Sequence, residues 1–373
     1  MKDLNTYRKT WAEIDLNAIT HNFKQIRRRL QGGVRMLAAV KANAYGHGLI
    51  NTSRHLEKIG ADFLGTSSID EAVELRKSGL KRPILNLSNL LRHETEAVIN
   101  FGITPTITDF RTARTLDTKA RFLNKQVPIH IKIDTGMGRI GLWHTEAERF
   151  IKDFKKLKNL TIEGIYTHFP SAEEDKEFTF RQIEEFNLFI EKIKSAGIKP
   201  HYSHAANSAA LLNYKNAHFN LVRPGLALYG IKPAGGEIDL KPALSFKTTV
   251  SYLKKICKGR SVGYGRTFMA EKDTLIATLP VGYADGYSQL FSNKAKVLVR
   301  NKFYPVAGMV CMDTTMIDIG LSCDIKVGDE VVLIGAQKEK SIKAEDLARL
   351  CGTIPYQILC WISSRVPRLY KNK

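Results

Sequence analysis

MLAAVKANAYGHG, residues 36–48, is an apolar run that ends in a polar turn with two glycines. Seven further apolar or β-branched runs follow before about Pro242, and segments with helical patterns separate them. Parallel strands joined by crossover helices produce this alternation. Eight such units in about 240 residues predict an α/β fold, an N-terminal (β/α)8 barrel of the TIM type, rather than an open doubly wound sheet. The eight predicted strands span 36–41, 62–67, 84–88, 104–108, 127–134, 160–169, 201–207 and 219–230.

Helix-boundary signals between these runs favour the same interpretation. Residues 68–71 read Ser-Ile-Asp-Glu, the pattern of a capping box at a helix start. In KSGL (77–80) and KSAGI (194–198), a glycine stands just past the expected end of a helix. We therefore expect helices in the segments between successive predicted strands.

The pattern changes after Pro242 to alternating runs separated by turn dipeptides, at 245–253, 274–281, 295–300, 302–310, 314–319 and 329–335. Such runs predict mostly antiparallel β-structure. A helix is expected at 341–350, closed by Cys351-Gly352, and a second one from Pro355. The predicted domains are a barrel over 1–242 and a C-terminal mostly-β domain over 243–373, with the first ~12 residues free to pack with the second domain.

Composition limits the class of protein. Of the 373 residues 43% are hydrophobic and 25% charged, as in folded globular proteins. The five cysteines are odd in number and contain no C-x-x-C pair, so neither a disulfide framework nor a cysteine zinc site is indicated, and we expect no metal. The chain begins without an apolar signal segment and has no stretch of about 18 apolar residues. A cytoplasmic protein without a membrane partner is expected.

The net charge of +20 raises the question of nucleic-acid binding. Basic runs occur at 24–29, 152–158 and 254–260, but the first two lie on helical patterns and alternate with apolar residues. They are typical of solvated helix faces, and no nucleic-acid-binding motif accompanies them. We expect anionic small molecules, rather than nucleic acid, as partners.

Catalytic residues of a (β/α)8 barrel gather where its strands end. The first strand leads to Lys41. A surface lysine at a loop is the simpler interpretation. In an apolar barrel mouth, however, desolvation would lower the pKa of a lysine, and an uncharged amine can form a Schiff base.

The fifth strand places His130, Lys132 and Asp134 on one face because side chains alternate along a strand. The strand leads into Thr-Gly-Met-Gly and then Arg139, where the glycines allow close approach of a ligand and the arginine offers a planar donor fork. An ion pair between Lys132 and Asp134 inside the barrel is the structural alternative.

The last three strands also end in polar residues. The sixth strand contains His168 near its end, the seventh leads to Asn207 and Ser208, and the eighth contains Arg223 before Pro224-Gly225. Asn207 or Ser208 is suited to cap the next helix, and loops after strands seven and eight of such barrels frequently bind phosphate. A core histidine and a helix cap remain the alternatives without function.

Eight strings together resemble the alanine racemases, pyridoxal-phosphate (PLP) enzymes built from a (β/α)8 barrel and a C-terminal β-domain. They are AVKANAYGHG (39–48), KIDTGMGRIG (132–141), YTHF (166–169), HAANSA (204–209), VRPGLALYG (222–230), VGYGRTF (262–268), LPVGYADGY (279–287) and VCMD (310–313). Each string alone has a false-positive risk, but their order and spacing match the family over essentially the whole chain.

The resemblance implies two catalytic bases. Lys41 would bind PLP as a Schiff base and serve as one base, and Tyr264, donated by the partner subunit of a homodimer, would be the other. Racemisation removes a proton from one face of Cα and returns one on the opposite face, so one base cannot easily do both. Such a protein would interconvert L-alanine and D-alanine and supply D-alanine for peptidoglycan.

The resemblance also implies the binding residues. His168 and Arg223 would link Tyr264 to the pyridine nitrogen, and Lys132 matches a lysine that is carbamylated in many members. A carbamate there would replace a like-charge contact with Arg139 by an attractive one. The cofactor-binding residues would be Lys41, Tyr45, Arg139, His168, Asn207, Ser208, Arg223, Gly225, Leu226 and Tyr356, and the substrate-binding residues Arg139, Met312, Tyr283, Cys311 and Asp313.

Departures from the family pattern concern the substrate entrance. Thr314 stands where glutamine is common, and Gln289 and Met309 stand where some members carry arginines. These positions leave the substrate range open. A racemase of serine or of broad specificity would keep nearly all the catalytic residues and differ in the size of the pocket.

Two other classes fit less well. A PLP-dependent decarboxylase is expected to place a carboxylate, instead of Arg223, at the pyridine nitrogen. A non-catalytic PLP-binding barrel resembles the first domain, but lacks the β-domain that contains Tyr264.

Overall fold

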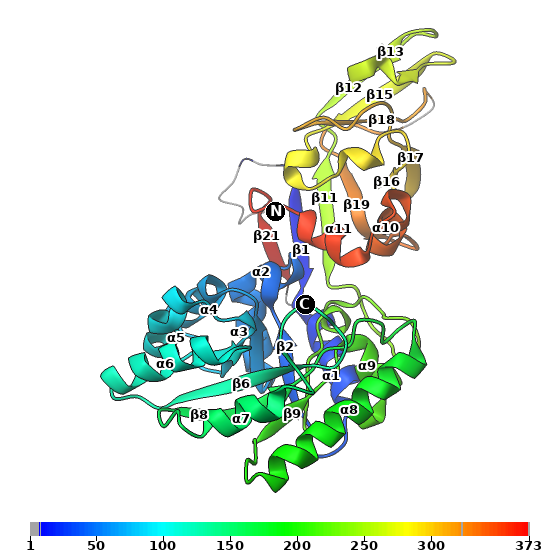
Figure 1. The fold of residues 1–373 in the computed structure, drawn as a ribbon. Coiled ribbons are helices and arrows are strands. Elements are labelled where there is room, and N and C mark those ends of the chain that lie inside the picture. Colours follow the sequence, from blue (N-terminus) through cyan, green and yellow to red (C-terminus); the bar gives the residue numbers. More distant parts are fainter. Residues whose placement is uncertain (1–6, 8, 322–323, 372–373) are drawn as a thin grey trace. The chain divides into compact units, whose positions relative to one another are not determined.

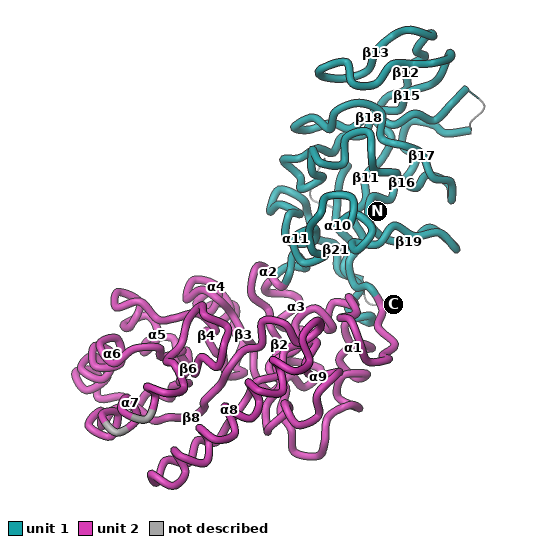
Figure 2. The backbone as a smooth tube through the Cα atoms, turned by 45° about the vertical axis from the view of Figure 1, so that its right-hand side comes forward, with its two compact units in different colours: residues 1–18, 45–48, 242–373 teal, residues 19–44, 49–241 magenta. Residues whose placement is uncertain are grey.

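The computed structural model describes residues 7, 9–321 and 324–371 of the chain. It contains two compact units, shown in different colours in Figure 2. The barrel unit comprises residues 19–44 and 49–241, and the β unit comprises residues 1–18, 45–48 and 242–373. The domain limits 1–242 and 243–373 stay predictions.

The barrel unit is built around one parallel sheet, which confirms the predicted fold class. Its strand order is β10-β2-β3-β4-β5-β6-β8-β9, and every neighbouring pair is parallel. The backbone bond from Arg223 N–H to the Ala206 carbonyl, 2.9 Å, brings the two end strands together and nearly closes the barrel. The strands are β2 (Arg35–Ala39), β3 (Phe63–Thr66), β4 (Ile84–Asn89), β5 (Thr104–Ile107), β6 (Val127–Asp134), β8 (Leu160–Tyr166), β9 (Tyr202–His204) and β10 (Leu221–Val222), with the short β7 (Leu142–Trp143) beside β6.

Helices lie around the outside of these strands (Figure 1). The buried side chains Leu37, Phe63, Leu85 and Leu221 form one apolar cluster among the strands, and each such side chain contributes about 1.5–3 kcal/mol by leaving water. The helices are α1 (Leu16–Arg29), α3 (Leu49–Lys58), α4 (Ile69–Lys77), α5 (Thr95–Phe101), α6 (Phe110–Phe122), α7 (Ala147–Phe154), α8 (Lys176–Ser195) and α9 (Ser208–Asn213), with 3₁₀ turns η1 (Arg92–Glu94), η2 (Lys215–Ala217) and η3 (Leu226–Tyr229).

The predicted helix ends are confirmed, and one predicted helix start is corrected. Gly79 and Gly197 follow α4 and α8 with φ of 88° and 78°, the left-handed region that glycine adopts most readily. Ser68 caps α4, because its Oγ accepts a hydrogen bond from the Glu71 N–H at 3.1 Å. The reciprocal half of the capping box is wrong, since the Glu71 carboxylate accepts instead from the N–H groups of Ser67 and Asn43.

The β unit is mostly antiparallel, as predicted. One sheet has the order β17-β16-β19-β11-β1-β21, with β20 beside β19; a second has the order β12-β15-β18; β13 pairs with β14. Within these described sheets β1 and β21 are parallel neighbours. The strands are β1 (Trp11–Asp15), β11 (Leu244–Thr249), β12 (Tyr252–Ile256), β13 (Ser261–Val262), β14 (Phe268–Met269), β15 (Thr274–Leu279), β16 (Lys296–Val299), β17 (Lys302–Pro305), β18 (Thr315–Asp318), β19 (Glu330–Gln337), β20 (Lys340–Ile342) and β21 (Arg368–Lys371).

Two helices and three 3₁₀ turns complete the β unit: α10 (Ala344–Cys351), α11 (Pro355–Trp361), η4 (Tyr264–Arg266), η5 (Tyr283–Asp285) and η6 (Gln289–Phe291). The helix predicted from residue 341 begins later, because Lys340–Ile342 pairs with β19 as strand β20. Gly352, with φ 63°, ends α10, and Pro355 opens α11, as expected. Among all the described helices of both units, none is long and apolar enough to span a bilayer.

Candidate active site

Lys41 stands at the end of the first barrel strand, before an unusual backbone segment. Ala42, Asn43, Ala44 and Tyr45 all have φ between 53° and 55°, so the residues labelled α2 (Lys41–Tyr45) form a left-handed turn. In L-residues this conformation brings Cβ too close to the following carbonyl oxygen and costs about 1–2 kcal/mol per residue. A run of four such residues beside a candidate catalytic lysine is strain of the kind found at functional sites.

Lys132 on β6 is buried, with 1% of its surface exposed. Its Nζ has no hydrogen-bond partner among the described residues. The pKa of Lys132 is lowered to about 7, first by burial and then by the positive charges of Arg139 and Arg223. A neutral amine is therefore accessible at this position near neutral pH.

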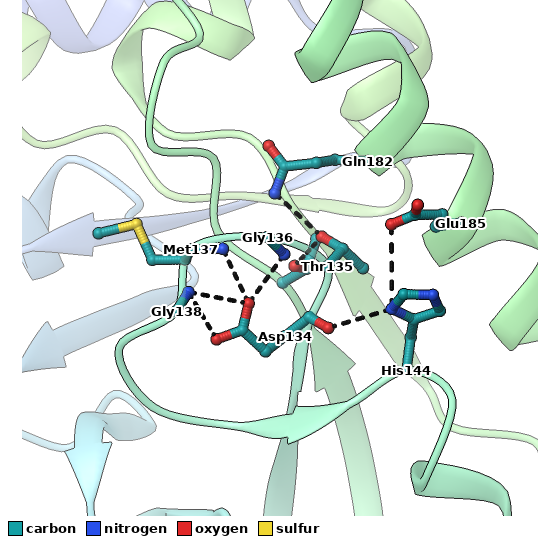
Figure 3. Close-up of polar contacts among 9 residues, drawn as sticks. Asp134, Thr135, Gly136, Met137, Gly138, His144, Gln182 and Glu185 are labelled. Carbon is teal, nitrogen blue, oxygen red and sulfur yellow. Dashed lines mark hydrogen bonds and ion pairs between the residues drawn. The ribbon is translucent and has the colours of Figure 1, made fainter.

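Asp134 does not form the ion pair with Lys132 that was the structural alternative, so that alternative is wrong. Its carboxylate accepts hydrogen bonds of 2.8 to 3.2 Å from the backbone N–H groups of Gly136, Met137 and Gly138 (Figure 3). Gly136 and Gly138 have φ of 136° and 66°, which permits the tight loop. Asp134 thus shapes the loop that leads to Arg139, and its charge raises the pKa of Lys132 by less than burial and the two arginines lower it.

Positive charge gathers at this mouth. Lys41, Lys132, Arg139 and Arg223 all lie close enough to lower the pKa of His168, although burial is the largest cause of that shift, which takes the pKa well below its usual value. The mouth of the barrel unit is therefore suited to an anionic group.

Arg223 is the most constrained of the four cations. It is 5% exposed, and burial lowers its pKa to about 10, so the guanidinium remains charged at neutral pH. Its Nη2 donates to the carbonyl oxygens of Thr167 and Ala205, both at 2.8 Å, and lies 3.3 Å from Nδ1 of His168. Arg223 and His168 are thus in contact, while the link to Tyr264 and the pyridine nitrogen stays a prediction.

A hydrogen-bond chain leads from Arg223 into the barrel. Arginine only donates, so Nδ1 of His204, 2.7 Å from Arg223 Nη1, must accept. The hydrogen of His204 is then on Nε2 and points to Nδ1 of His130 at 2.8 Å, and Nε2 of His130 donates to Glu163 at 3.3 Å. This order fixes one neutral tautomer for each histidine, and burial lowers the pKa of both.

Gly164 makes room for this chain. A Cβ added to Gly164 would lie 2.4 Å from Cε1 of His130, closer than packed atoms allow. The sequence analysis placed His130 on the polar face of its strand but missed the roles of His204, Glu163 and Gly164. The chain joins strands that are far apart in sequence, so local spacing contains no signal for it.

Tyr166 is another residue to which the sequence analysis gave no role. Its ring stacks on His204 with 4.6 Å between centroids, and the guanidinium carbon of Arg223 lies 5.1 Å from the ring centroid. Cations are attracted to aromatic faces at such distances. Tyr166 therefore stabilises the charge of Arg223 through the face of its ring.

Two further polar residues support the β6 loop. The hydroxyls of Thr135 and Thr167 are 2.7 Å apart, and Gln182 on α8 donates to Thr135 at 3.2 Å (Figure 3). These contacts connect the loop after β6 to the segment that contains His168.

The loops after β9 and β10 meet at Ser208. Asn207 caps α9, because its side chain accepts from the Ala210 N–H at 2.9 Å, which confirms the expected cap. The Oγ of Ser208 accepts from the backbone N–H groups of Gly225 at 2.9 Å and Ala227 at 3.3 Å. Two loops that the sequence analysis assigned to phosphate thus converge on one hydroxyl, with Leu226 buried between the two donors.

In the β unit the predicted substrate residues form one patch. Backbone bonds of 3.0 and 3.1 Å join Tyr283 to Cys311 and Ala284 to Met312. The close approach requires Gly282, where an added Cβ would lie 2.2 Å from the Cys311 carbonyl oxygen. Tyr283 and Met312 remain 43% and 54% exposed.

Asp313 is held beside this patch by Arg365. Arg365 lies 2.6 Å from Asp313 and 3.2 Å from the fully buried Asp285. This arginine was not singled out in the sequence analysis. It ties η5 to the segment that contains Met312.

Tyr264 opens η4 and is 75% exposed. It follows Gly263, whose φ is 75° and whose added Cβ would lie 3.4 Å from the Met309 nitrogen. Elsewhere in the β unit, the rings of Tyr45 and Tyr356 lie 6.0 Å apart, and burial raises the pKa of Tyr45. The candidate residues of each unit are thus assembled within that unit: Lys41, Lys132, Arg139, His168, Asn207, Ser208, Arg223, Gly225 and Leu226 in the barrel unit, and Tyr45, Tyr264, Tyr283, Cys311, Met312, Asp313 and Tyr356 in the β unit.

The described parts of the chain contain no group of three or more His, Cys, Asp or Glu side chains that could hold a metal ion. The cationic mouth is built from lysines and arginines.

A (β/α)8 barrel with lysine and arginine at its mouth, followed by a mostly antiparallel β unit, defines a class of two-domain barrel enzymes. Residues 14–233 match the sequence model of the alanine racemase N-terminal domain family. Residues 243–370 match that of the alanine racemase C-terminal domain family. The chain belongs to the alanine racemase family, which confirms the resemblance found in the sequence.

Relatives match over nearly the full length. The alanine racemase of Halothermothrix orenii is 44% identical over 370 residues, 98% of each chain, and alanine racemase 1 of Clostridium acetobutylicum is 42% identical over 369 residues, 97% of this chain and 95% of the relative. Among solved structures, that of alanine racemase from Clostridium difficile 630 has a TM-score of 0.94 at 36% identity and covers 98% of this chain and 97% of its own. The alanine racemase of Bartonella henselae, solved with covalently bound pyridoxal phosphate, has a TM-score of 0.88 at 29% identity, covering 97% and 99%.

Proposed function

We propose that this protein interconverts L-alanine and D-alanine with PLP as its cofactor, and that it supplies D-alanine for peptidoglycan in the cytoplasm. The observation that carries the proposal is the barrel mouth, where Lys41 stands among cations and Arg223 is buried and fully hydrogen-bonded on Nη2. The family membership and the named relatives support the same reaction.

The residues fit the proposed cofactor. Lys41 offers a primary amine for a Schiff base, and the Ser208 hydroxyl with the backbone N–H groups of Gly225 and Leu226 would hold the phosphate. The uncompensated positive charge of the mouth suits an anion. Of the cofactor-binding residues proposed, Lys41, Arg139, His168, Asn207, Ser208, Arg223, Gly225 and Leu226 come from the barrel unit, and Tyr45 and Tyr356 from the β unit.

When bound, PLP supplies an electron sink for the electrons that remain at Cα after proton removal. Lys41 Nζ removes or returns the proton on one face of Cα, and the Tyr264 hydroxyl does so on the other. Arg223 orients the ring nitrogen as a donor and, since arginine keeps its proton at neutral pH, does not transfer one. The Arg223–His204–His130 chain holds the guanidinium for this task.

We further propose that Tyr264 acts in the site of the partner subunit of a homodimer. Its 75% exposure leaves the phenol side chain available for such a contact. Arg139, with Met312, Tyr283, Cys311 and Asp313, would bind the substrate carboxylate and side chain. A monomer would then be inactive.

Lys132 is proposed to be carbamylated. Attack of its neutral amine on CO₂ forms an N–C bond, breaks one C–O π bond and releases one proton, which converts a neutral amine into an anion. A buried Nζ without a hydrogen-bond partner and with a pKa near 7 supports this modification. The carbamate would be the counter-charge for Arg139.

One experiment tests the function directly. Purified protein should absorb in the visible range after PLP is added and excess PLP is removed, and it should form D-alanine from L-alanine. A serine or broad-specificity racemase would act on L-serine as fast as on L-alanine, and a non-catalytic PLP-binding protein would bind the cofactor without forming either product.

A further inference from the structure

Glu71 stands in a position that neither helix capping nor the racemase reaction explains. It lies in the first turn of α4, and its own N–H is held by Ser68 at 3.1 Å. Its carboxylate leaves the helix: Oε1 accepts from the Asn43 N–H at 3.1 Å, and Oε2 accepts from the Ser67 N–H at 3.2 Å. One carboxylate therefore connects the loop after β2 to the loop after β3.

The loop that Glu71 reaches is the strained one. Asn43 is the second residue after Lys41 and lies within the left-handed run, with φ 55° and ψ 44°. Other bonds of this segment include two between neighbouring residues: the Ala44 N–H donates to the Val40 carbonyl at 2.7 Å, and the Asn43 side chain accepts from the Leu49 N–H at 2.7 Å. Both are local in sequence and move with the segment. Glu71 supplies the bond that ties the turn to a separate helix.

We infer that Glu71 is a positioning residue, which holds the left-handed turn and thereby fixes the direction in which Lys41 leaves the barrel strand. The inference deepens the proposed function and rests on it, because Lys41 is taken as the cofactor-binding base. Without the bond to Glu71, strain favours relaxation of residues 42–44 toward right-handed or extended backbone. Such relaxation changes the direction of the Cα–Cβ bond of Lys41 relative to the barrel strands.

The first test measures the turn itself. In Glu71→Ala, the amide hydrogens of Asn43 and Ser67 should exchange with solvent about 5–10-fold faster, the effect of one lost hydrogen bond of ordinary net strength. Asp70→Ala is the matched control, since Asp70 is an exposed acidic residue in the same first helical turn and makes no bond to the loop. Equal exchange at Asn43 in Glu71→Ala and Asp70→Ala would overturn the inference.

The second test connects the turn to Lys41. PLP-loaded Glu71→Ala should show about ten-fold lower kcat with KM for L-alanine changed less than two-fold, and slower trapping of Lys41 by borohydride. Glu71→Gln keeps one acceptor oxygen, so only one of the two amides should exchange faster, with a smaller fall in kcat. If Glu71→Ala does not fold, Glu71→Gln decides: unchanged exchange at both amides would contradict the proposed contact.

A rescue separates positioning from general stability. Ala42 is exposed and has φ 54°, where glycine carries no Cβ penalty. Ala42→Gly should therefore restore part of the kcat lost in Glu71→Ala, while Asp70→Ala/Ala42→Gly gains nothing. No rescue would overturn the strain argument. Failure of the proposed function is distinguishable, because Lys41→Ala would then keep its activity while the exchange difference at Asn43 persisted.

Discussion

The cationic residues at the mouth of the barrel unit differ from Tyr264 and Met312 of the β unit in how far they are buried. Arg223 and Lys132 are 5% and 1% exposed, whereas Tyr264 and Met312 are 75% and 54% exposed. An unpaired buried polar group costs about 1–3 kcal/mol. Arg223 avoids this cost through its hydrogen bonds, whereas Lys132, with no hydrogen-bond partner among the described residues, has a lowered pKa instead. The difference teaches that the barrel unit builds the cationic mouth by itself, while Tyr264 and Met312 keep exposed surface, which the proposed contact with a partner subunit needs.

Removing the barrel lysine should produce the largest loss. Lys41→Ala is expected to lower kcat/KM for L-alanine by about 10³-fold or more, because both the covalent attachment and one base disappear. Steady-state assays measure the loss, and borohydride reduction with peptide mapping should find the PLP adduct on Lys41 in the native protein. Lys58→Ala, an exposed lysine of α3, is the control. Label on another lysine would contradict the assignment.

Substitution of Tyr264 should give the next largest loss, and the loss should differ between the two enantiomers of alanine. Tyr264→Phe removes one proton donor, so exchange of the α-hydrogen should slow about 10²–10⁴-fold for one alanine enantiomer and much less for the other. Stereospecific solvent-deuterium exchange measures both rates. Tyr252→Phe, an exposed tyrosine of β12, should change neither rate. Equal slowing for both enantiomers would be incompatible with two opposite-face bases.

Lys132 tests whether the barrel mouth needs an added negative charge. We expect Lys132→Ala to lower kcat/KM about ten-fold, which corresponds to about 1.4 kcal/mol. With ¹³C-bicarbonate, native protein should show a carbamate carbon signal that Lys132→Ala lacks. Because the pKa of Lys132 is about 7, the signal should weaken as pH falls below 7 and the amine becomes protonated. A native protein without this signal at pH 8 would refute carbamylation.

The buried histidine chain predicts a pH dependence of stability. Burial lowers the pKa of His130, His168 and His204, so the unfolded state binds more protons below its own histidine pKa of about 6.5. Their contribution to stability is present above pH 6.5 and is lost as pH falls from there toward the folded-state values, by at most about 1.4 kcal/mol per pH unit for each group.

Urea unfolding at pH 7.5 and pH 5.5 measures this loss. His130→Asn should lose less stability between the two pH values than native protein, by at most about 1.4 kcal/mol. His93→Asn, at an exposed position of the same unit, should behave as native. An identical loss in His130→Asn and native protein would mean that His130 binds protons equally in both states.

A substitution at Met309, which the sequence assigns to the substrate entrance, should have the smallest effect on kcat/KM. Met309→Arg adds a positive charge where some family members carry one, and should raise kcat/KM for L-alanine modestly, about two-fold, at low ionic strength with kcat almost unchanged. The gain should shrink at high salt because ions screen the added charge. A strong change in kcat would show instead that position 309 shapes the pocket.

Local patterns predicted much of this protein. The strand runs, the glycines after α4 and α8, the cap at Asn207 and Pro355 at the start of α11 depend on interactions within a few residues. Period two placed His130, Lys132 and Asp134 at one strand end, and family motifs supplied the candidate roles of Lys41 and Tyr264. Those roles stay predictions.

Contacts between distant strands decided the rest. The sequence suggested a capping box at Ser68 and an ion pair between Lys132 and Asp134, yet Glu71 bonds to Asn43 and Asp134 bonds to its own loop. In both cases an accessible backbone N–H competes with the expected partner.

Sequence alone determined the repeating βα pattern, the change to β-structure after Pro242 and the residue types available at each strand end, because these depend on short-range periodicity. Only the tertiary structure decided which of those residues meet. The nearly closed sheet brings Arg223, His204 and His130 into one chain, and it buries Lys132, whose Nζ has no hydrogen-bond partner among the described residues. Burial then shifts their pKa values, since desolvation acts on a group only after the whole barrel has formed around it.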